Sequence, residues 1–175
     1  MVILVTGATH TGKTALAQKL LETYGYPYLS MDHLKMGLIR SGNTSLTPMD
    51  REEALTAYLW PIVREMVKTV IENGQNLIVE GCYIPANWRE DFEGRYLKEI
   101  RCYCLVMSPR YIREHFANIR QHANAVEQRL DDSCCTADML LRDNAEVLRQ
   151  CKLHSVPPIL IDDDYENDLQ KGLNL

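Results

Sequence analysis

The sequence predicts an α/β fold with a five-stranded parallel sheet and helices on both of its faces. Short, nearly continuous apolar runs alternate with longer segments of helical periodicity, which is typical of strands buried on both sides. The chain has 175 residues, of which 46% are hydrophobic and 25% charged, a composition that suits a globular domain with a substantial core. We therefore expect a single three-layer α/β/α domain over residues 1–175.

The apolar runs are the expected strands, and the segments between them are the expected helices. The strands fall at 2–6, 27–30, 76–80, 100–107 and 158–162. The helices fall at 13–24, 32–41, 50–72, 86–96, 109–125 and 135–153. Thr47 to Asp50 predicts the cap and first turn of the long third helix. Pro61 predicts a kink or a break inside it, because proline lacks a backbone N–H.

The charge and the apolar runs disfavour several classes of partner. The net charge is −5, whereas dedicated nucleic-acid binders usually carry a basic surface. No apolar run reaches the ~20 residues that span a membrane, and the first strand leaves no room for a signal peptide. The six cysteines contain no C-x-x-C pair, so we expect reduced, packing thiols. We predict a cytoplasmic protein without nucleic-acid or membrane partners, and the sequence leaves its oligomeric state open.

The segment after the first strand matches the pattern G-x-x-x-x-G-K-[ST] in full. It consists of Gly7, Ala8, Thr9, His10, Thr11, Gly12, Lys13 and Thr14, and Ala15 continues into the next helix. The glycines let successive backbone N–H groups point at phosphate oxygens, and the helix start adds its positive dipole end. Lys13 supplies a charge to the β- and γ-phosphates, and the Thr14 hydroxyl is a ligand for Mg²⁺. Residues 7–15 therefore predict a site for a nucleoside triphosphate with Mg²⁺. We expect His10 to be a variable loop residue and not a catalytic base.

The chain resembles the nucleoside-monophosphate kinase-like branch of P-loop kinases, with features of the 2-phosphoglycerate kinase type. The resemblance rests on the small size, the N-terminal phosphate loop and an acid after the second strand. It also rests on Ile78-Val79-Glu80-Gly81, with an aliphatic residue and a proline shortly after it, at Ile84 and Pro85. The stretch 82–85 lacks the arginine of adenylate kinases. The resemblance implies the strand order 2-3-1-4-5, a short helical lid at about 118–134 and ATP with Mg²⁺ as cofactors.

The resemblance also implies roles for residues at the strand ends. Asp32 becomes a general base or an anchor for the phosphoryl acceptor, and a helix N-cap is the alternative or an additional role. Glu80 becomes an acceptor contact and a Mg²⁺ ligand through water, unless it only caps its strand. Lys35 and Arg40 line the acceptor pocket or are surface charges. Tyr83 forms a wall of the pocket or packs in the core.

Arginines are expected to close over the transferred phosphoryl group, on which negative charge gathers. By resemblance, Arg120 and Arg129 are the catalytic lid arginines, and Arg129-Leu130-Asp131-Asp132 resembles the end of an adenylate kinase lid. Arg142 is a looser match to a further arginine of those enzymes. A solvated helix face is the alternative for all of them, and it is the preferred interpretation for Arg110 and Arg113.

These observations favour an ATP-dependent kinase for a small, anionic or hydroxylated acceptor, such as a nucleotide or a phosphoglycerate-like metabolite. An ATP-binding regulatory or switch protein with little turnover is the competing prediction. A GTPase is disfavoured because the sequence contains no N-K-x-D motif. The choice between ATP and GTP, and the identity of the acceptor, stay open. Phosphorylation of nucleic-acid ends is weakened by the acidic charge.

Overall fold

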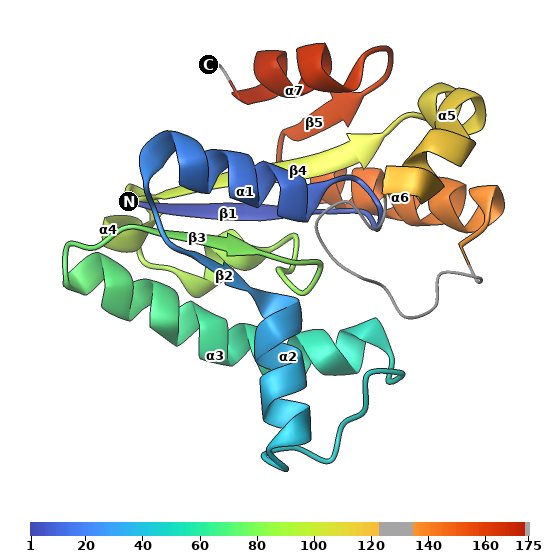
Figure 1. Cartoon of the computed structure of the whole chain (residues 1–175). Helices are drawn as coiled ribbons and strands as arrows, with labels where there is room; N and C mark the ends of the chain where they lie inside the picture. The colour runs from blue at the N-terminus through green and yellow to red at the C-terminus, as the bar shows by residue number, and fades with distance from the viewer. Residues whose placement is uncertain (123–134, 174–175) are drawn as a thin grey trace. The chain divides into compact units, whose positions relative to one another are not determined.

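The structure is a computed structural model that describes residues 1–122 and 135–173 (Figure 1). The chain forms two compact units. The first unit contains residues 1–6 and 17–102, and the second contains residues 7–16 together with the described chain from Tyr103 onward. Each contact described below joins residues of the same unit.

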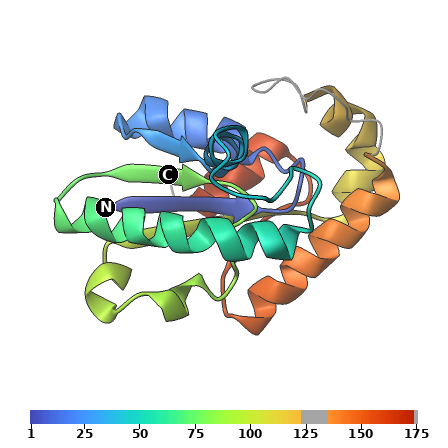
Figure 2. The same ribbon diagram turned by 90° about the horizontal axis from the view of Figure 1, so that it is seen from below.

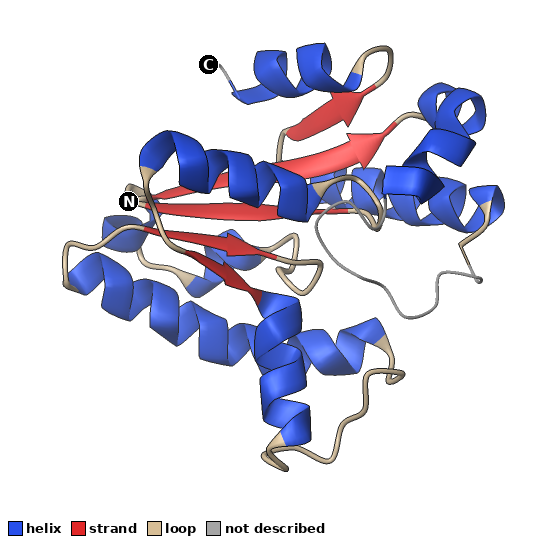
Figure 3. Ribbon diagram, in the orientation of Figure 1, coloured by secondary structure: helices blue, strands red, loops and turns tan. Residues whose placement is uncertain are grey.

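The five predicted strands form a sheet in the order β2-β3-β1-β4-β5, which confirms the expected fold class and topology (Figure 3). They are β1 (Val2–Gly7), β2 (Tyr28–Ser30), β3 (Leu77–Glu80), β4 (Ile100–Met107) and β5 (Pro158–Ile161). The strand pairs within each unit are parallel. Glu80 is the register partner of both Val5 and Ser30. The carboxyl ends of β1, β2 and β3 therefore meet around Glu80.

The long helices also lie where the sequence predicts them. They are α1 (Lys13–Tyr24), α2 (Met31–Arg40), α3 (Glu52–Glu72), α5 (Pro109–His122) and α6 (Ala137–Leu153). A further helix, α7 (Tyr165–Leu173), follows β5 and was absent from the prediction. Its apolar residues Leu169 and Leu173 are buried and four residues apart, which is the signal that could have revealed it.

The predicted helix at 86–96 is wrong. This stretch contains a short 3-10 helix η1 (Trp88–Asp91) and a single turn α4 (Gly94–Leu97), separated by Phe92 in an extended conformation. The apparent helical period comes from Trp88, Phe92 and Tyr96, which are spaced by four residues. Their rings pack edge to face at centroid distances of 6.1 and 6.3 Å, so the spacing reflects core packing.

The start and the middle of α3 also differ from expectation. The helix begins at Glu52, because Asp50 accepts hydrogen bonds from the backbone N–H and the hydroxyl of Thr47 and closes a separate turn before it. Pro61 lies inside one helix and does not divide it into two. Of the two predicted outcomes, the break is therefore wrong, and the kink stays a prediction.

The core of the first unit lies between α3 and the strands. Leu59, Val63 and Val67 on α3 are in one buried cluster with residues of β1 and β3, among them Leu4 and Val79. Figure 2 shows α3 lying along β1. This packing fixes the strands whose ends carry Ser30 and Glu80.

The core of the second unit includes two thiols, Cys104 on β4 and Cys151 on α6, whose Sγ atoms are 3.3 Å apart. Three of the described cysteines, Cys104, Cys135 and Cys151, are buried. None of the described helices is long and apolar enough to cross a membrane.

Candidate phosphate loop and acceptor site

The phosphate loop connects β1 directly to α1 and lies in the second unit. Gly7 has a φ of 136° and Gly12 a φ of 80°, conformations that glycine adopts readily. A Cβ on Gly7 would overlap the backbone of Leu105, whose carbonyl accepts a hydrogen bond from the N–H of Ala8 at 3.2 Å. The first glycine of the motif is thus required for the close approach of the loop to β4.

Tyr165, the first residue of α7, lies against the second glycine of the motif. Its hydroxyl donates to the carbonyl of Thr11 at 3.1 Å, and a Cβ on Gly12 would overlap that hydroxyl. Burial, followed by the nearby charge of Glu166, raises the pKa of Tyr165 to about 12, so the phenol is neutral at physiological pH. The sequence prediction missed Tyr165 because it missed α7.

The side chains of the loop also close it from within. The hydroxyl of Thr11, which is buried, donates to the carbonyl of Ala8 at 2.7 Å. The ammonium of Lys13 donates to the same carbonyl at 2.7 Å. His10 adopts a φ of 62°, and its Nδ1 lies 3.2 Å from the Thr9 hydroxyl. The side chain of Lys13 therefore reaches back across the loop that would surround the phosphates.

Helix α6 holds the loop through Asp143, a residue that the sequence prediction missed. The Asp143 carboxylate accepts a hydrogen bond from the backbone N–H of Thr9 at 2.6 Å. The next residue, Asn144, is buried, accepts from the N–H of Met107 at 2.7 Å and donates to the carbonyl of Leu140. Two consecutive side chains of α6 thereby fix the phosphate loop and the carboxyl end of β4.

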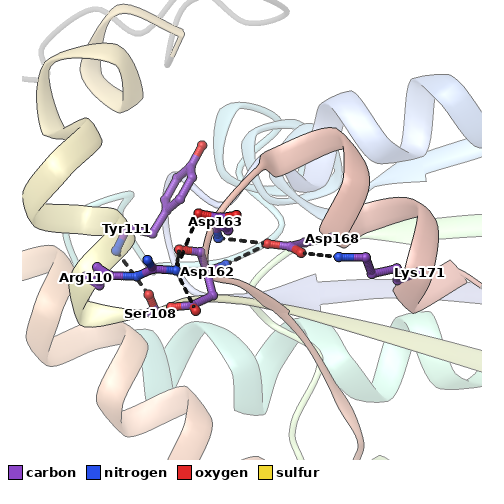
Figure 4. A network of polar contacts seen from close by, with 7 residues as sticks. All are labelled: Ser108, Arg110, Tyr111, Asp162, Asp163, Asp168 and Lys171. Carbon is purple, nitrogen blue, oxygen red and sulfur yellow. Dashed lines mark hydrogen bonds and ion pairs between the residues drawn. The ribbon is translucent and has the colours of Figure 1, made fainter.

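A polar network joins the start of α5 to the segment between β5 and α7 (Figure 4). The Arg110 guanidinium donates to the carboxylate of Asp162 at 2.9 Å and to its carbonyl at 3.0 Å, and lies 3.6 Å from Asp163. Asp168 accepts the N–H groups of Asp162 and Asp163, which lower the pKa of its carboxyl group to about 2. Arg110 therefore orders this segment, as expected of a surface charge with an ion-pair partner.

The other predicted arginines of the described chain are exposed on helices. Arg113 and Arg120 are exposed on α5. Arg142 is exposed on α6 and donates from Nε to the carbonyl of Asp138 in its own helix at 3.3 Å. Arg129 lies outside the described residues, as does the lid from residue 123 onward. The catalytic roles of Arg120 and Arg129 stay predictions.

The candidate acceptor site lies in the first unit, at the ends of β2 and β3. The ammonium of Lys35 donates to Asp32 Oδ1 at 2.5 Å and to the Tyr83 hydroxyl at 2.8 Å. It also lies 5.0 Å from the centroid of the Tyr83 ring. The N-cap of α2 is Ser30, and Asp32 belongs to the first helical turn, so the N-cap alternative for Asp32 is wrong.

The protonation states of Lys35 and Tyr83 follow from these contacts. Burial opposes the charge of Lys35, but the hydrogen bonds to Asp32 and Tyr83 outweigh burial and raise the pKa of the ammonium. Burial, with the neighbouring Cys82, raises the pKa of Tyr83 to about 12, although the hydrogen bond from Lys35 acts in the opposite direction. Near neutral pH the site thus holds a charged lysine and a neutral phenol.

Glu80 is buried at the end of a strand, whereas Arg40 is exposed at the end of a helix. Glu80 ends β3 with only 2% of its surface exposed, and Gly81 follows with a φ of 155°. A Cβ on Gly81 would come within 2.8 Å of Met31 Cβ, so glycine lets β3 end close to α2. Arg40 is exposed at the last residue of α2. The structure brings Asp32, Lys35 and Tyr83 together but does not bring Arg40 to them.

The predicted Mg²⁺ ligands Thr14 and Glu80 are oxygen donors, the type that Mg²⁺ prefers. Thr14 follows Lys13 in the first turn of α1. Within residues 1–122 and 135–173, no group of three or more His, Cys, Asp or Glu side chains could hold a metal ion. These two oxygen donors fit a Mg²⁺ ion whose other ligands include phosphate oxygens of the nucleotide.

Searches with the sequence find no matching protein-family model and no matching curated protein. Solved structures are similar in fold. A gluconokinase from Sinorhizobium meliloti aligns with a TM-score of 0.57 and 18% identity over 99% of this chain and 89% of its own. A shikimate kinase from Bacteroides thetaiotaomicron has a TM-score of 0.54 and 18% identity, over 100% and 99%. A deoxyadenosine kinase from M. mycoides has a TM-score of 0.55 and 12% identity, over 99% and 97%. The chain therefore has the fold of P-loop kinases.

Proposed function

We propose that this protein is a P-loop phosphotransferase that transfers the γ-phosphoryl group of ATP to a small acceptor. The observation that carries the proposal is the phosphate loop itself. Its full motif follows a strand and opens a helix, its two glycines occupy positions that a side chain would block, and Lys13 lies across it. Gluconokinase, shikimate kinase and deoxyadenosine kinase structures share the fold, which supports this choice of reaction.

The donor half of the proposed reaction rests on residues 7–15. Backbone N–H groups of the loop would bind the β- and γ-phosphates, and the Lys13 ammonium would move from the Ala8 carbonyl to them. Bound Mg²⁺ would supply charge neutralisation at these phosphates, with Thr14 as a direct ligand and Glu80 as a ligand through water. Arg120 and Arg129 are proposed to stabilise the charge on the transferred group from a lid at about 118–134.

The acceptor half rests on Asp32, with Lys35 and Tyr83 beside it. In the proposed step a hydroxyl group of the acceptor gives its proton to the Asp32 carboxylate, and its oxygen bonds to the γ-phosphorus. The bond between that phosphorus and the bridging oxygen breaks, and ADP leaves. The acceptor is anionic or hydroxylated, such as a nucleotide or a phosphoglycerate-like metabolite. Arg40 is exposed at the far end of α2, so its part in acceptor binding is the least supported.

A panel of metabolites tests this proposal. The purified protein is incubated with ATP and Mg²⁺ and one compound at a time from sugars, polyols, hydroxy acids, nucleosides, nucleoside monophosphates and phosphoglycerates. ADP release is followed, and products are identified by mass. A phosphorylated acceptor formed in step with ADP supports the kinase. Tight ATP binding without a phosphorylated product from any compound would instead support the regulatory switch.

A further inference from the structure

The first unit contains a compact set of three polar side chains, Asp32, Lys35 and Tyr83, which we call the acceptor triad. Lys35 is central, because its ammonium donates to both other members. The side chain of Lys35 is only 12% exposed, whereas that of Asp32 is 42% exposed. The carboxylate therefore faces solvent, and the lysine supports it from within.

The hydrogen bonds fix what the acceptor triad can offer to a ligand. Because Lys35 donates to the Tyr83 oxygen, the proton of the neutral Tyr83 hydroxyl points away from Lys35 and can be donated, although Tyr83 itself is only 6% exposed and belongs to the buried cluster of this unit. Within residues 1–122 and 135–173, the Asp32 carboxylate has no hydrogen-bond partner other than Lys35, so its second oxygen is available as an acceptor. One donor and one acceptor, side by side, match the hydroxyl groups of a polyol or sugar.

The charges of the acceptor triad also favour a hydroxylated, uncharged ligand. Asp32 and Lys35 cancel one another, and Tyr83 is neutral. Two of the three N–H donors of the Lys35 ammonium are already used by Asp32 and Tyr83, so one is left for a ligand. The other cation predicted for this site, Arg40, lies eight residues beyond Asp32, about 12 Å along α2.

From these observations we propose that the acceptor is an uncharged hydroxylated compound, a polyol or sugar, and not a phosphate ester. This inference rests on the proposed kinase function and narrows it. A phosphate dianion beside Asp32 would meet a carboxylate that already pairs with the neighbouring lysine, and like charges in contact oppose binding. Lys35 is a positioning residue in this account, since it holds Asp32 and orients the Tyr83 hydroxyl.

Matched pairs of compounds test the inference. Each pair consists of an uncharged parent and its phosphate monoester: glycerol and glycerol 3-phosphate, ribose and ribose 5-phosphate, glucose and glucose 6-phosphate, adenosine and AMP. We expect at least one parent to be phosphorylated with a kcat/KM tenfold or more above that of its ester. Turnover that favours the ester would overturn the inference and leave the kinase intact. If neither member of any pair nor any other metabolite is phosphorylated, the proposed function itself fails.

Variants of the acceptor triad test the charge argument by ester binding as well as by turnover. Asp32→Asn leaves Lys35 without its counter-charge, so calorimetry should show ester binding that is several-fold tighter than in the wild-type protein. Lys35→Met leaves the negative charge of Asp32 without a counter-charge. Ester binding should weaken further, and the kcat for the parent compound should be lower. Lys35→Arg keeps the charge and should restore most of that kcat. Unchanged ester binding in both Asp32→Asn and Lys35→Met would contradict the charge argument.

Discussion

The carboxylate of Asp143 on α6 accepts a hydrogen bond from the backbone N–H of Thr9, 134 residues earlier in the chain, at 2.6 Å. The contact places an acid against a loop that is built to bind phosphates. An anion at this position has two opposing effects. It holds the loop in shape, and it adds negative charge close to the proposed triphosphate site.

Substitutions of Asp143 separate these two effects. Asp143→Ala leaves the Thr9 N–H without its partner, so we expect a loss of about 1–3 kcal/mol in the free energy of unfolding and weaker ATP binding. Asp143→Asn keeps an acceptor oxygen and removes the charge, so it should bind ATP at least as tightly as the wild-type protein.

Asp138→Ala, which changes an exposed acid on the same helix, is the control. Chemical unfolding and calorimetric titration with ATP measure both quantities. Equal ATP affinity in the Ala variant and the wild-type protein would show that the contact does not shape the loop.

Gly12 and Tyr165 make a second prediction. A Cβ on Gly12 would overlap the Tyr165 hydroxyl, and the substituted residue would have to keep a positive φ. Gly12→Ala should therefore weaken ATP binding by tenfold or more. Tyr165→Phe removes the overlapping oxygen, and the double variant should regain part of the affinity. Gly25→Ala is the matched control, because Gly25 also has a positive φ but open space around it. It should cost about 1 kcal/mol of stability and leave ATP binding unchanged. Full affinity in Gly12→Ala would show that the loop is not packed as the structure has it.

Asp168 provides a prediction about pH. Its carboxyl pKa is lowered to about 2, mainly because it accepts the backbone N–H groups of Asp163 and Asp162, with a smaller part from Lys171. A folded-state pKa below the unfolded value of about 3.9 gives stability that is present above pH 4 and lost as the pH falls towards 2. Asp168→Asn should therefore be less stable than the wild-type protein at pH 7, and the difference should shrink between pH 5 and pH 2. Lys171→Ala should have a smaller effect. Chemical unfolding across this range is the measurement, and a difference that stays constant with pH would exclude the proposed role of Asp168.

The fold was predictable from the sequence because its signals are local. Buried strands produce apolar runs, and the phosphate-loop motif fixes the end of β1 and the start of α1. The errors have local causes as well. The aromatic residues at 88, 92 and 96 imitate a helical period, although Phe92 is extended. Pro61 suggested a break that the packing of α3 against β1 and β3 overrides.

The candidate site was predictable only in part. Asp32 and Tyr83 were singled out because each follows a strand, and Lys35 because it lies on the helix after the second strand. The structure brings the three together. Arg40 was included because it shares α2 with Lys35, but its position at the helix end separates it from them. Asp143 and Tyr165 contact the phosphate loop from helices more than 130 residues along the chain, and no local pattern indicates such contacts.

Phosphoryl transfer itself is the most direct test of the central claim. ATP labelled in its γ-phosphate is supplied with Mg²⁺ and the best acceptor of the panel, and labelled product is measured for wild-type protein, Lys13→Ala and Asp32→Asn, with Lys19→Ala as a control on α1. The account predicts one labelled acceptor per ADP for the wild-type and control proteins, and a rate at least ~10²-fold lower in Lys13→Ala and Asp32→Asn. A Lys13→Ala protein with full transfer, or a wild-type protein that releases label only as free phosphate, would contradict it.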